Sequence, residues 1–245
     1  MNTIYIPKGK AKEYGDYALN IYTGCPHRCY YCFAPSVLRR DKEQFHLCVE
    51  PRKNIVEETT RRLAQGGIKG KLIHLCFTCD PYPTGYDTTA TREIIKLIKE
   101  SGNHVQILTK GDGSRDFDLL DGNDWYGVTY SCGDSAAEKA EPGAATPSCR
   151  LSTLQMAKEL GINTWVSFEP VINADEVLGA LRWLMATETD YLRKCVSVDK
   201  VKFGKLNYYP SDINWKEFGE QAEALCKQLG VDYYIKESLR AEMEK

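Results

Sequence analysis

The sequence predicts an α/β fold, a partial (β/α)6-type TIM barrel with parallel strands, formed by a single domain over residues 1–245. Strand-like and helix-like stretches alternate along the chain, which is typical of parallel βαβ units. Gly102, Gly161 and Gly230 each follow a helix-like stretch, where C-terminal glycines are expected. Six or seven such units in 245 residues favour a barrel, since α/β barrels of this length often form one domain.

The elements follow in a regular order. The helix at 54–65 has Asn54 as its expected cap and ends at Gly66 and Gly67. The acidic, Gly/Ala/Pro-rich segment 133–148 is predicted to be a mobile loop that could cover the barrel mouth. Strands are expected at 17–23, 71–79, 104–110, 125–132, 163–169, 196–204 and 231–236, and the other helices at 89–101, near 115–121, at 151–160, 174–186 and 214–229.

Composition and charge narrow the class of protein. The 42% hydrophobic and 27% charged residues are typical of a globular chain, and no apolar run is long enough to span a membrane. The N-terminus has no apolar signal region, so a cytoplasmic location is expected, with ten cysteines acting as ligands, reactive thiols or core residues. Residues 1–75 hold 13 Lys/Arg against 7 Asp/Glu. This basic third could face an anionic substrate, or it could simply be solvated surface.

Polar residues gather toward the carboxyl ends of the expected strands. In the strand at 71–80, alternation places Cys76, Thr78 and Asp80 on one face and an apolar set on the other. Ser167 and Glu169 stand at the same end of a later strand. Because barrel active sites lie at the carboxyl ends of the strands, this polar face is predicted to line the lumen.

The most informative stretch is a short loop after the first strand, where Cys25, Cys29 and Cys32 have the spacing C-x3-C-x2-C. Thiolates are the ligands of iron–sulfur clusters, and three of them on a four-iron cluster leave one iron free to bind a small molecule. A zinc site is the alternative, with His27, His46 or Cys48 as a fourth ligand. The three cysteines could also be coincidental.

This loop resembles the signature of the radical S-adenosylmethionine (radical SAM) superfamily. Within it, the chain is most similar to the spore photoproduct lyase-like branch, and also to the paired radical SAM proteins of mobile elements. The stretches that carry the resemblance to the branch are Tyr22–Cys29, Phe77–Tyr82, Leu108–Lys110, Glu141–Ala144, Arg150–Leu151 and Phe203–Asn207.

The resemblance implies a 4Fe-4S cluster on the three cysteines and S-adenosylmethionine (SAM) on its open iron. Reductive cleavage of SAM would give a 5′-deoxyadenosyl radical that abstracts hydrogen from a substrate, with a nucleic acid or nucleotide as the first expectation. The implied partners are an electron donor such as flavodoxin or ferredoxin and a paired radical SAM protein. The implied cofactor contacts are Tyr31, Thr78, Asp80, Lys110, Ser131, Ser167 and Glu169.

The resemblance also points to a hydrogen-atom donor. Cys76, on the predicted lumen face, is the candidate, with a small buried core residue as the plain alternative. Phe33 departs from the branch pattern, which has a tyrosine after the third cysteine, and this puts photoproduct repair itself in doubt. Two alternative hypotheses remain. One is a radical SAM enzyme that modifies a peptide or small molecule, and the other is a non-catalytic iron–sulfur protein that binds a partner or senses redox state.

Overall fold

The computed structural model describes residues 3–186 and 196–245. Within the described residues, seven parallel strands form one sheet in chain order, which confirms the predicted α/β class and the seven expected strands. The strands are β1 (Tyr17–Leu19), β2 (Leu72–Leu75), β3 (His104–Thr109), β4 (Trp125–Thr129), β5 (Asn163–Val171), β6 (Lys200–Lys205) and β7 (Asp232–Ile235).

The sheet is a partial barrel because its two edge strands are β1 and β7, which do not pair with each other in the part of the chain that the structure describes. A short antiparallel bridge from Tyr5 to Ala18 covers the free edge of β1. All neighbouring strands run parallel, so the loops that follow them meet at one end of the sheet. That end is the mouth at which a site is expected.

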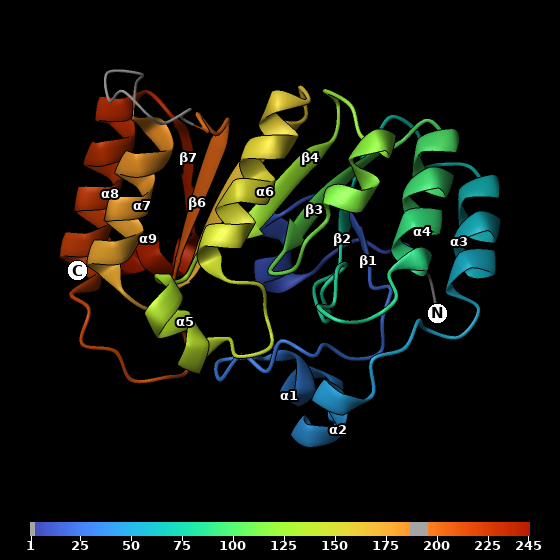
Figure 1. Cartoon of the computed structure of the whole chain (residues 1–245), viewed down its shortest axis with the longest axis horizontal. Helices are drawn as coiled ribbons and strands as arrows, with labels where there is room; N and C mark the ends of the chain where they lie inside the picture. The colour runs from blue at the N-terminus through green and yellow to red at the C-terminus, as the bar shows by residue number, and fades with distance from the viewer. Residues whose placement is uncertain (1–2, 187–195) are drawn as a thin grey trace.

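Helices cover the sheet and its mouth, with α3, α4, α6, α7 and α8 along the sheet and α1, α2 and α5 together beyond one end of it (Figure 1). None of the helices in the described ranges is long and apolar enough to cross a membrane. The helices are α1 (Ala34–Leu38), α2 (Lys42–Leu47), α3 (Ile55–Ala64), α4 (Thr89–Glu100), α5 (Asp134–Ala140), α6 (Pro147–Glu159), α7 (Ala174–Met185), α8 (Trp215–Leu229) and α9 (Glu237–Met243), with 3-10 helices η1 (Gly9–Glu13) and η2 (Ser114–Leu119).

Several predicted boundaries are wrong at the mouth. β1 ends at Leu19 and β2 at Leu75, both four residues before the predicted ends at 23 and 79. Cys76 has φ +70°, a left-handed backbone that ends the extended run. The expected loop 133–148 instead contains α5 and the start of α6, which Thr146 caps and where Pro147 stands at the first position. Asn54 precedes α3 but makes no capping hydrogen bond.

The lumen of the sheet is filled by aromatic rings around Tyr14, which follows η1. Its ring centroid lies 5.3 Å from that of His74, 5.5 Å from Phe77 and 6.1 Å from Trp165. The ammonium of Lys202 lies 3.3 Å from the Tyr14 ring centroid, a close cation–π contact. The lumen is therefore filled by side chains that pack around the N-terminal segment.

Candidate functional site

The cysteine loop follows β1 and is held by α2. The Cys25 amide donates to the Phe45 carbonyl at 3.2 Å, and the His46 ring nitrogen Nδ1 lies 2.8 Å from the Cys25 carbonyl oxygen. Gly24 allows this contact, because a Cβ there would lie 2.2 Å from the Phe45 oxygen. The sequence therefore places a glycine where the loop backbone packs directly on α2.

The three thiols of this loop differ little in environment. Cys29 is buried, and Cys25 and Cys32 are half-buried. Burial raises the pKa of all three, that of Cys29 to about 11, although the nearby Lys110 opposes the rise for Cys29 and Cys32. Without a bound cation these sulfurs stay protonated thiols, and a metal that bound them would supply the positive charge that favours the thiolates.

No three His, Cys, Asp or Glu side chains within residues 3–186 and 196–245 converge on a point where a single metal ion would sit. A four-iron cluster does not need such convergence, since each thiolate binds a different iron and the sulfurs surround the cluster. His46 is turned to the Cys25 carbonyl and Cys48 is exposed. The donor set of three thiols on one loop therefore fits a cluster better than the zinc alternative.

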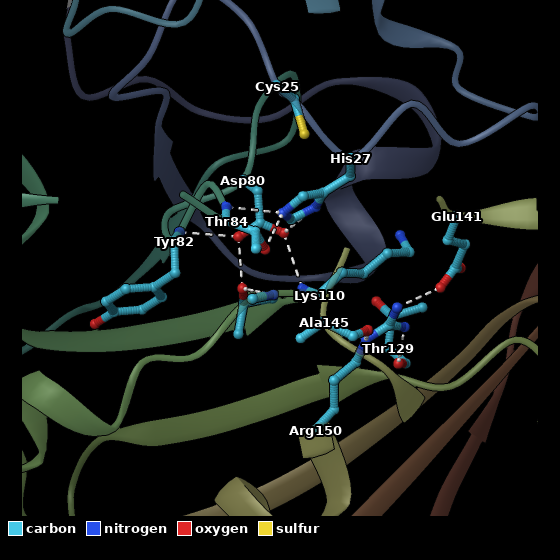
Figure 2. Close-up of polar contacts among 12 residues, drawn as sticks. Cys25, His27, Asp80, Tyr82, Thr84, Lys110, Thr129, Glu141, Ala145 and Arg150 are labelled. Carbon is cyan, nitrogen blue, oxygen red and sulfur yellow. Dashed lines mark hydrogen bonds and ion pairs between the residues drawn. The ribbon is translucent and has the colours of Figure 1, made fainter. Parts of the chain in front are cut away.

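Asp80 is the centre of a polar network below the loop (Figure 2). Its carboxylate accepts hydrogen bonds from the backbone amides of Tyr82 and Lys110, each at 2.9 Å, and from the Thr109 hydroxyl at 2.5 Å. The Nδ1 atom of His27 lies 3.5 Å from Asp80. Asp80 thus joins the loops after β1, β2 and β3, so its first role in this structure is to position them.

His27 links the cysteine loop to the loop after β2. Its Nε2 accepts a hydrogen bond from the Thr84 amide at 3.3 Å, which places the ring proton on Nδ1, toward Asp80. Burial lowers the pKa of His27 although Asp80 opposes this, so the ring is neutral at pH 7. Thr78, another predicted cofactor contact, accepts a hydrogen bond from Arg52 at 3.4 Å.

Lys110 and Tyr31 lie together beside Cys29. The Lys110 ammonium lies 5.4 Å from the Tyr31 ring centroid and makes no hydrogen bond or ion pair with another described residue. Burial alone would lower the pKa of Lys110, but Cys29 and Glu141 more than compensate and raise it. Lys110 is therefore a charged group with unused donors, which suits an anionic or hydroxyl-bearing ligand.

A buried ion pair lies under Tyr31. The Arg150 guanidinium donates to the Glu141 carboxylate at 2.5 Å, and both residues are at most 3% exposed. The Ser131 hydroxyl donates to Glu141 at 2.9 Å, and the Tyr31 hydroxyl also donates to it. Burial would raise the pKa of Glu141, but Lys110 and Arg150 lower it, so the carboxylate stays charged. Tyr31 and Ser131 are thus brought together as predicted neighbours of one site.

The segment that contains Glu141 also packs against the cysteine loop and donates a hydrogen bond to it. The Gly143 amide donates to the His27 carbonyl at 3.0 Å, and the Ala145 amide donates to the Lys110 carbonyl at 2.9 Å. A Cβ on Gly143 would lie 2.1 Å from the Pro26 oxygen. The stretch that was expected to be a mobile loop is therefore packed between the cysteine loop and β3.

Two predicted site residues on β5 belong to a different group. Glu169 accepts from the Tyr14 hydroxyl at 2.5 Å and from the Lys236 ammonium at 2.7 Å. Ser167 is buried beside the Tyr14 phenol. These contacts bind the N-terminal segment to the lumen. The contact partners of Ser167 and Glu169 therefore differ from those of the group around Asp80 and Lys110.

The alternation that placed Cys76 on the lumen face does not extend to it. The strand ends one residue earlier, and Cys76 is 6% exposed and lies in the main hydrophobic core. Its thiol is a neighbour of the Cys79 thiol, and the Tyr22 amide donates to the Cys79 sulfur at 3.4 Å. Strand alternation therefore does not determine where the Cys76 side chain points. The role of Cys76 as a hydrogen-atom donor stays a prediction.

Sequence reasoning did not assign Glu141, Arg150 or Tyr14 to the site. Glu141 and Arg150 stood in stretches that carry the family resemblance, but the Gly/Ala/Pro-rich composition between them indicated a loop. A fully buried arginine needs a carboxylate partner, and the Glu-Pro-Gly sequence nine residues earlier was the available signal. Tyr14 lies in a lysine-rich segment with no periodic pattern, so nothing in the sequence indicated its place in the lumen.

A parallel, partial α/β barrel with three thiols and the partly buried Lys110 at its mouth is the arrangement of a barrel-type protein whose donor set fits a cluster near the carboxyl end of β1. The model of the radical SAM superfamily matches residues 19–182, and the chain belongs to this superfamily. Membership of this family implies a 4Fe-4S cluster and SAM as cofactors.

Two curated relatives are an uncharacterized protein of Acidianus two-tailed virus and one of Mycobacterium tuberculosis strain H37Rv. The viral protein is 28% identical over 186 residues, which are 69% of this chain and 60% of the viral protein. The mycobacterial protein is 27% identical over 191 residues, 70% of this chain and 56% of the relative. The chain thus spans less than two thirds of the length of these relatives.

Solved structures resemble the whole fold. A variant of spore photoproduct lyase with bound SAM and a dinucleoside spore photoproduct has a TM-score of 0.69 and 13% identity, and the match covers 94% of this chain and 79% of the lyase. SuiB of Streptococcus suis bound to SAM has a TM-score of 0.62 and 8% identity, with coverage of 89% and 46%. At these identities the likeness concerns the fold alone.

Proposed function

We propose that this chain binds a 4Fe-4S cluster through Cys25, Cys29 and Cys32 and uses it to cleave SAM for radical chemistry on a nucleic acid or nucleotide. The cluster would supply the electron that breaks the sulfonium C–S bond of SAM to give a 5′-deoxyadenosyl radical. The observation that carries the proposal is the unpaired Lys110 ammonium beside Cys29 and Tyr31, at the mouth of a radical SAM fold.

The side chains around the loop have separate tasks in this proposal. Lys110 would bind the carboxylate or ribose of SAM, and Tyr31 would lie beside its adenine. Ser131 and Glu141 hold the Tyr31 ring in place, since both bind its hydroxyl. Asp80 and Thr78 would lie near the SAM amino group, while Asp80 also fixes the backbone of Lys110.

Charge and fold likeness support the substrate class. Residues 1–75 carry a net charge of +6, from 13 Lys/Arg and 7 Asp/Glu. The lyase of similar fold was solved with a dinucleoside spore photoproduct, and its likeness to this chain makes a nucleotide the first substrate to test. A reductant such as flavodoxin or ferredoxin must deliver the electron.

The test is anaerobic reconstitution with iron and sulfide, followed by dithionite and SAM. We expect about four irons per chain, a brown absorption near 400 nm and formation of 5′-deoxyadenosine. Alanine variants of Cys25, Cys29 or Cys32 should lose all three. Cys48→Ala and Cys149→Ala are matched controls, because both cysteines are exposed and lie outside the loop set.

Two results would separate this proposal from its rivals. A triple alanine variant that still binds about four irons would show that other residues hold the cluster. Wild-type protein that binds iron but leaves SAM intact would instead be a non-catalytic iron–sulfur protein. With 5′-deoxyadenosine formed, deuterium transfer from labelled candidate nucleotides, peptides or small molecules into 5′-deoxyadenosine would identify the substrate class.

A further inference from the structure

A cavity of about 400 Å³ lies between η1 and the loop that follows β6. This volume falls within the range of small-molecule sites in proteins, roughly 300–1,000 Å³. β6 ends at Lys205, so the cavity lies at the carboxyl ends of the strands, the same end of the sheet as the cysteine loop. Its lining includes Lys10, Lys205, Asn207, Tyr208, Tyr209 and Trp215.

Tyr208 presents an aromatic ring that the hydrophobic core does not bury. Its side chain is 89% exposed, and its backbone has φ +69°, a conformation that a bulky residue rarely adopts. A large ring kept in water on a strained backbone contributes little to the core. Such outliers gather at ligand sites, where the strain holds a group in position.

The charge beside this ring is positive and largely uncompensated. The Lys10 ammonium lies 5.7 Å from the Tyr208 ring centroid and 3.4 Å from the Asn207 side-chain oxygen. No carboxylate of the described residues pairs with Lys10, nor with the exposed Lys8 and Lys12 on the same segment. Lys205 pairs with Glu242, so Lys10 is the cation available to an anion in the cavity.

A row of tyrosines joins the cavity to the proposed SAM site. The Tyr209 hydroxyl donates to the Tyr30 carbonyl at 2.9 Å, and the two rings meet edge to face with centroids 5.3 Å apart. Tyr30 makes the same contact with Tyr31, again at 5.3 Å. The wall of the cavity is therefore in contact with the loop that carries the three cysteines.

We propose that this cavity is a nucleotide subsite that holds one unpaired base and its phosphate from a single-stranded nucleic acid. The base stacks on Tyr208, and the phosphate binds Lys10. An aromatic face next to a cation is the pairing that single-strand binding sites use, because every base has a flat face and every linkage a charge. The inference rests on the proposed function, whose substrate class it specifies.

The test measures binding of a fluorescein-labelled oligothymidylate to the reconstituted holoenzyme by fluorescence anisotropy over a series of salt concentrations. Tyr208→Gly removes the ring and also relieves the left-handed backbone, so misfolding does not explain its effect. We expect it to weaken binding by roughly five- to a hundredfold, the usual effect of losing one stacking ring. Tyr208→Phe should bind like the wild type.

Lys10→Ala tests the phosphate contact. It should make the negative slope of log affinity against log salt less steep by about 0.7, the value for one phosphate contact on a single strand. Lys69→Ala is the matched control, because Lys69 is equally exposed but precedes β2, at the opposite end of the sheet. It should leave both affinity and slope unchanged.

Several results would overturn the subsite. Tyr208→Gly with wild-type affinity would do so, and so would a wild-type enzyme that forms 5′-deoxyadenosine but binds no oligonucleotide, in which case the radical chemistry stands alone. Variants that bind the strand normally but accept electrons slowly from flavodoxin would make the surface a reductant site. Strand binding that depends on Tyr208 in a protein that leaves SAM intact would support the subsite and refute the radical chemistry.

Discussion

Replacing Arg150 with methionine should lower the free energy of unfolding by about 3–5 kcal/mol, the usual cost of breaking a buried ion pair. Arg150 is 1% exposed and donates to the Glu141 carboxylate at 2.5 Å. It also donates to the carbonyl oxygens of Thr129 at 2.9 Å and Ala145 at 2.8 Å. One side chain thus pairs with a buried charge and with two backbone acceptors, of which the Thr129 carbonyl is buried and the Ala145 carbonyl partly buried.

The magnitude follows from what the variant leaves behind. Methionine fills much of the arginine volume, so the cavity it creates is small. Glu141 keeps its hydrogen bonds from Ser131 and Tyr31. Lys110 is then the remaining nearby cation that stabilises the charged carboxylate. Each orphaned carbonyl costs about 1–3 kcal/mol before relaxation, and these costs overlap. A typical domain has about 5–15 kcal/mol in total, so the variant should fold with much reduced stability.

The assay is urea unfolding of the reduced apoprotein, followed by circular dichroism. The double variant Glu141→Gln/Arg150→Met removes both charges and should recover part of the loss, whereas Arg150→Lys should fall between it and the wild type. If Arg150→Met costs less than about 1 kcal/mol, the pair does not hold this region together. If the changes in the free energy of unfolding of the two single variants add up to that of the double variant, the two side chains are not coupled.

The other predictions concern single side chains. Lys110→Ala should weaken SAM binding about tenfold or more, as expected for a charge-assisted hydrogen bond, with unchanged iron content; an unaltered affinity by calorimetry would remove Lys110 from the site. Cys76→Ala should fold, bind iron and cleave SAM but alter the substrate-derived product, and an unchanged product would exclude Cys76 as a donor. Burial, reinforced by Lys236, lowers the pKa of Lys202 to about 7, so the folded state releases this proton before the unfolded state does. Unfolding free energy should therefore rise from pH 7 to 9 by roughly 2 kcal/mol more in the wild type than in Lys202→Met, and parallel pH profiles would refute this.

The strands and the outer helices could be predicted because they repeat a pattern. β3 and α4 match their expected ranges to within a residue, since period-two burial and a C-terminal glycine define them. The mouth could not be predicted in the same way. The strand after α3 stops at Leu75 because Cys76 is left-handed, and no pattern in Phe77–Asp80 indicates that change. The predicted alternation up to Asp80 therefore runs five residues beyond the point where it applies.

The site was predictable where chemistry fixes the residue type. Cysteine spacing predicted a metal-binding loop, and the family resemblance implied Lys110, Tyr31 and Ser131, which the structure brings to one place beside that loop. Glu141 was missed because its partner Arg150 lies beyond a turn that only packing on the cysteine loop defines. Long-range ion pairs of this kind leave no periodic signal in a single sequence.

The filled lumen decides from which side a substrate can approach. His74 and Phe77 pack ring to ring at 4.4 Å, and the Tyr14 hydroxyl is bound to Glu169, so these side chains occupy the space below the mouth. Lys202 donates to the Glu13 carbonyl at 2.6 Å and ties the N-terminal segment to β6. Under the proposed function, a substrate would therefore approach the SAM site beside Lys110 from the rim of the mouth rather than through the lumen. The rim includes Tyr208 and Tyr209. A flexible single-stranded nucleic acid that lies across this rim suits the geometry better than a ligand enclosed by the barrel.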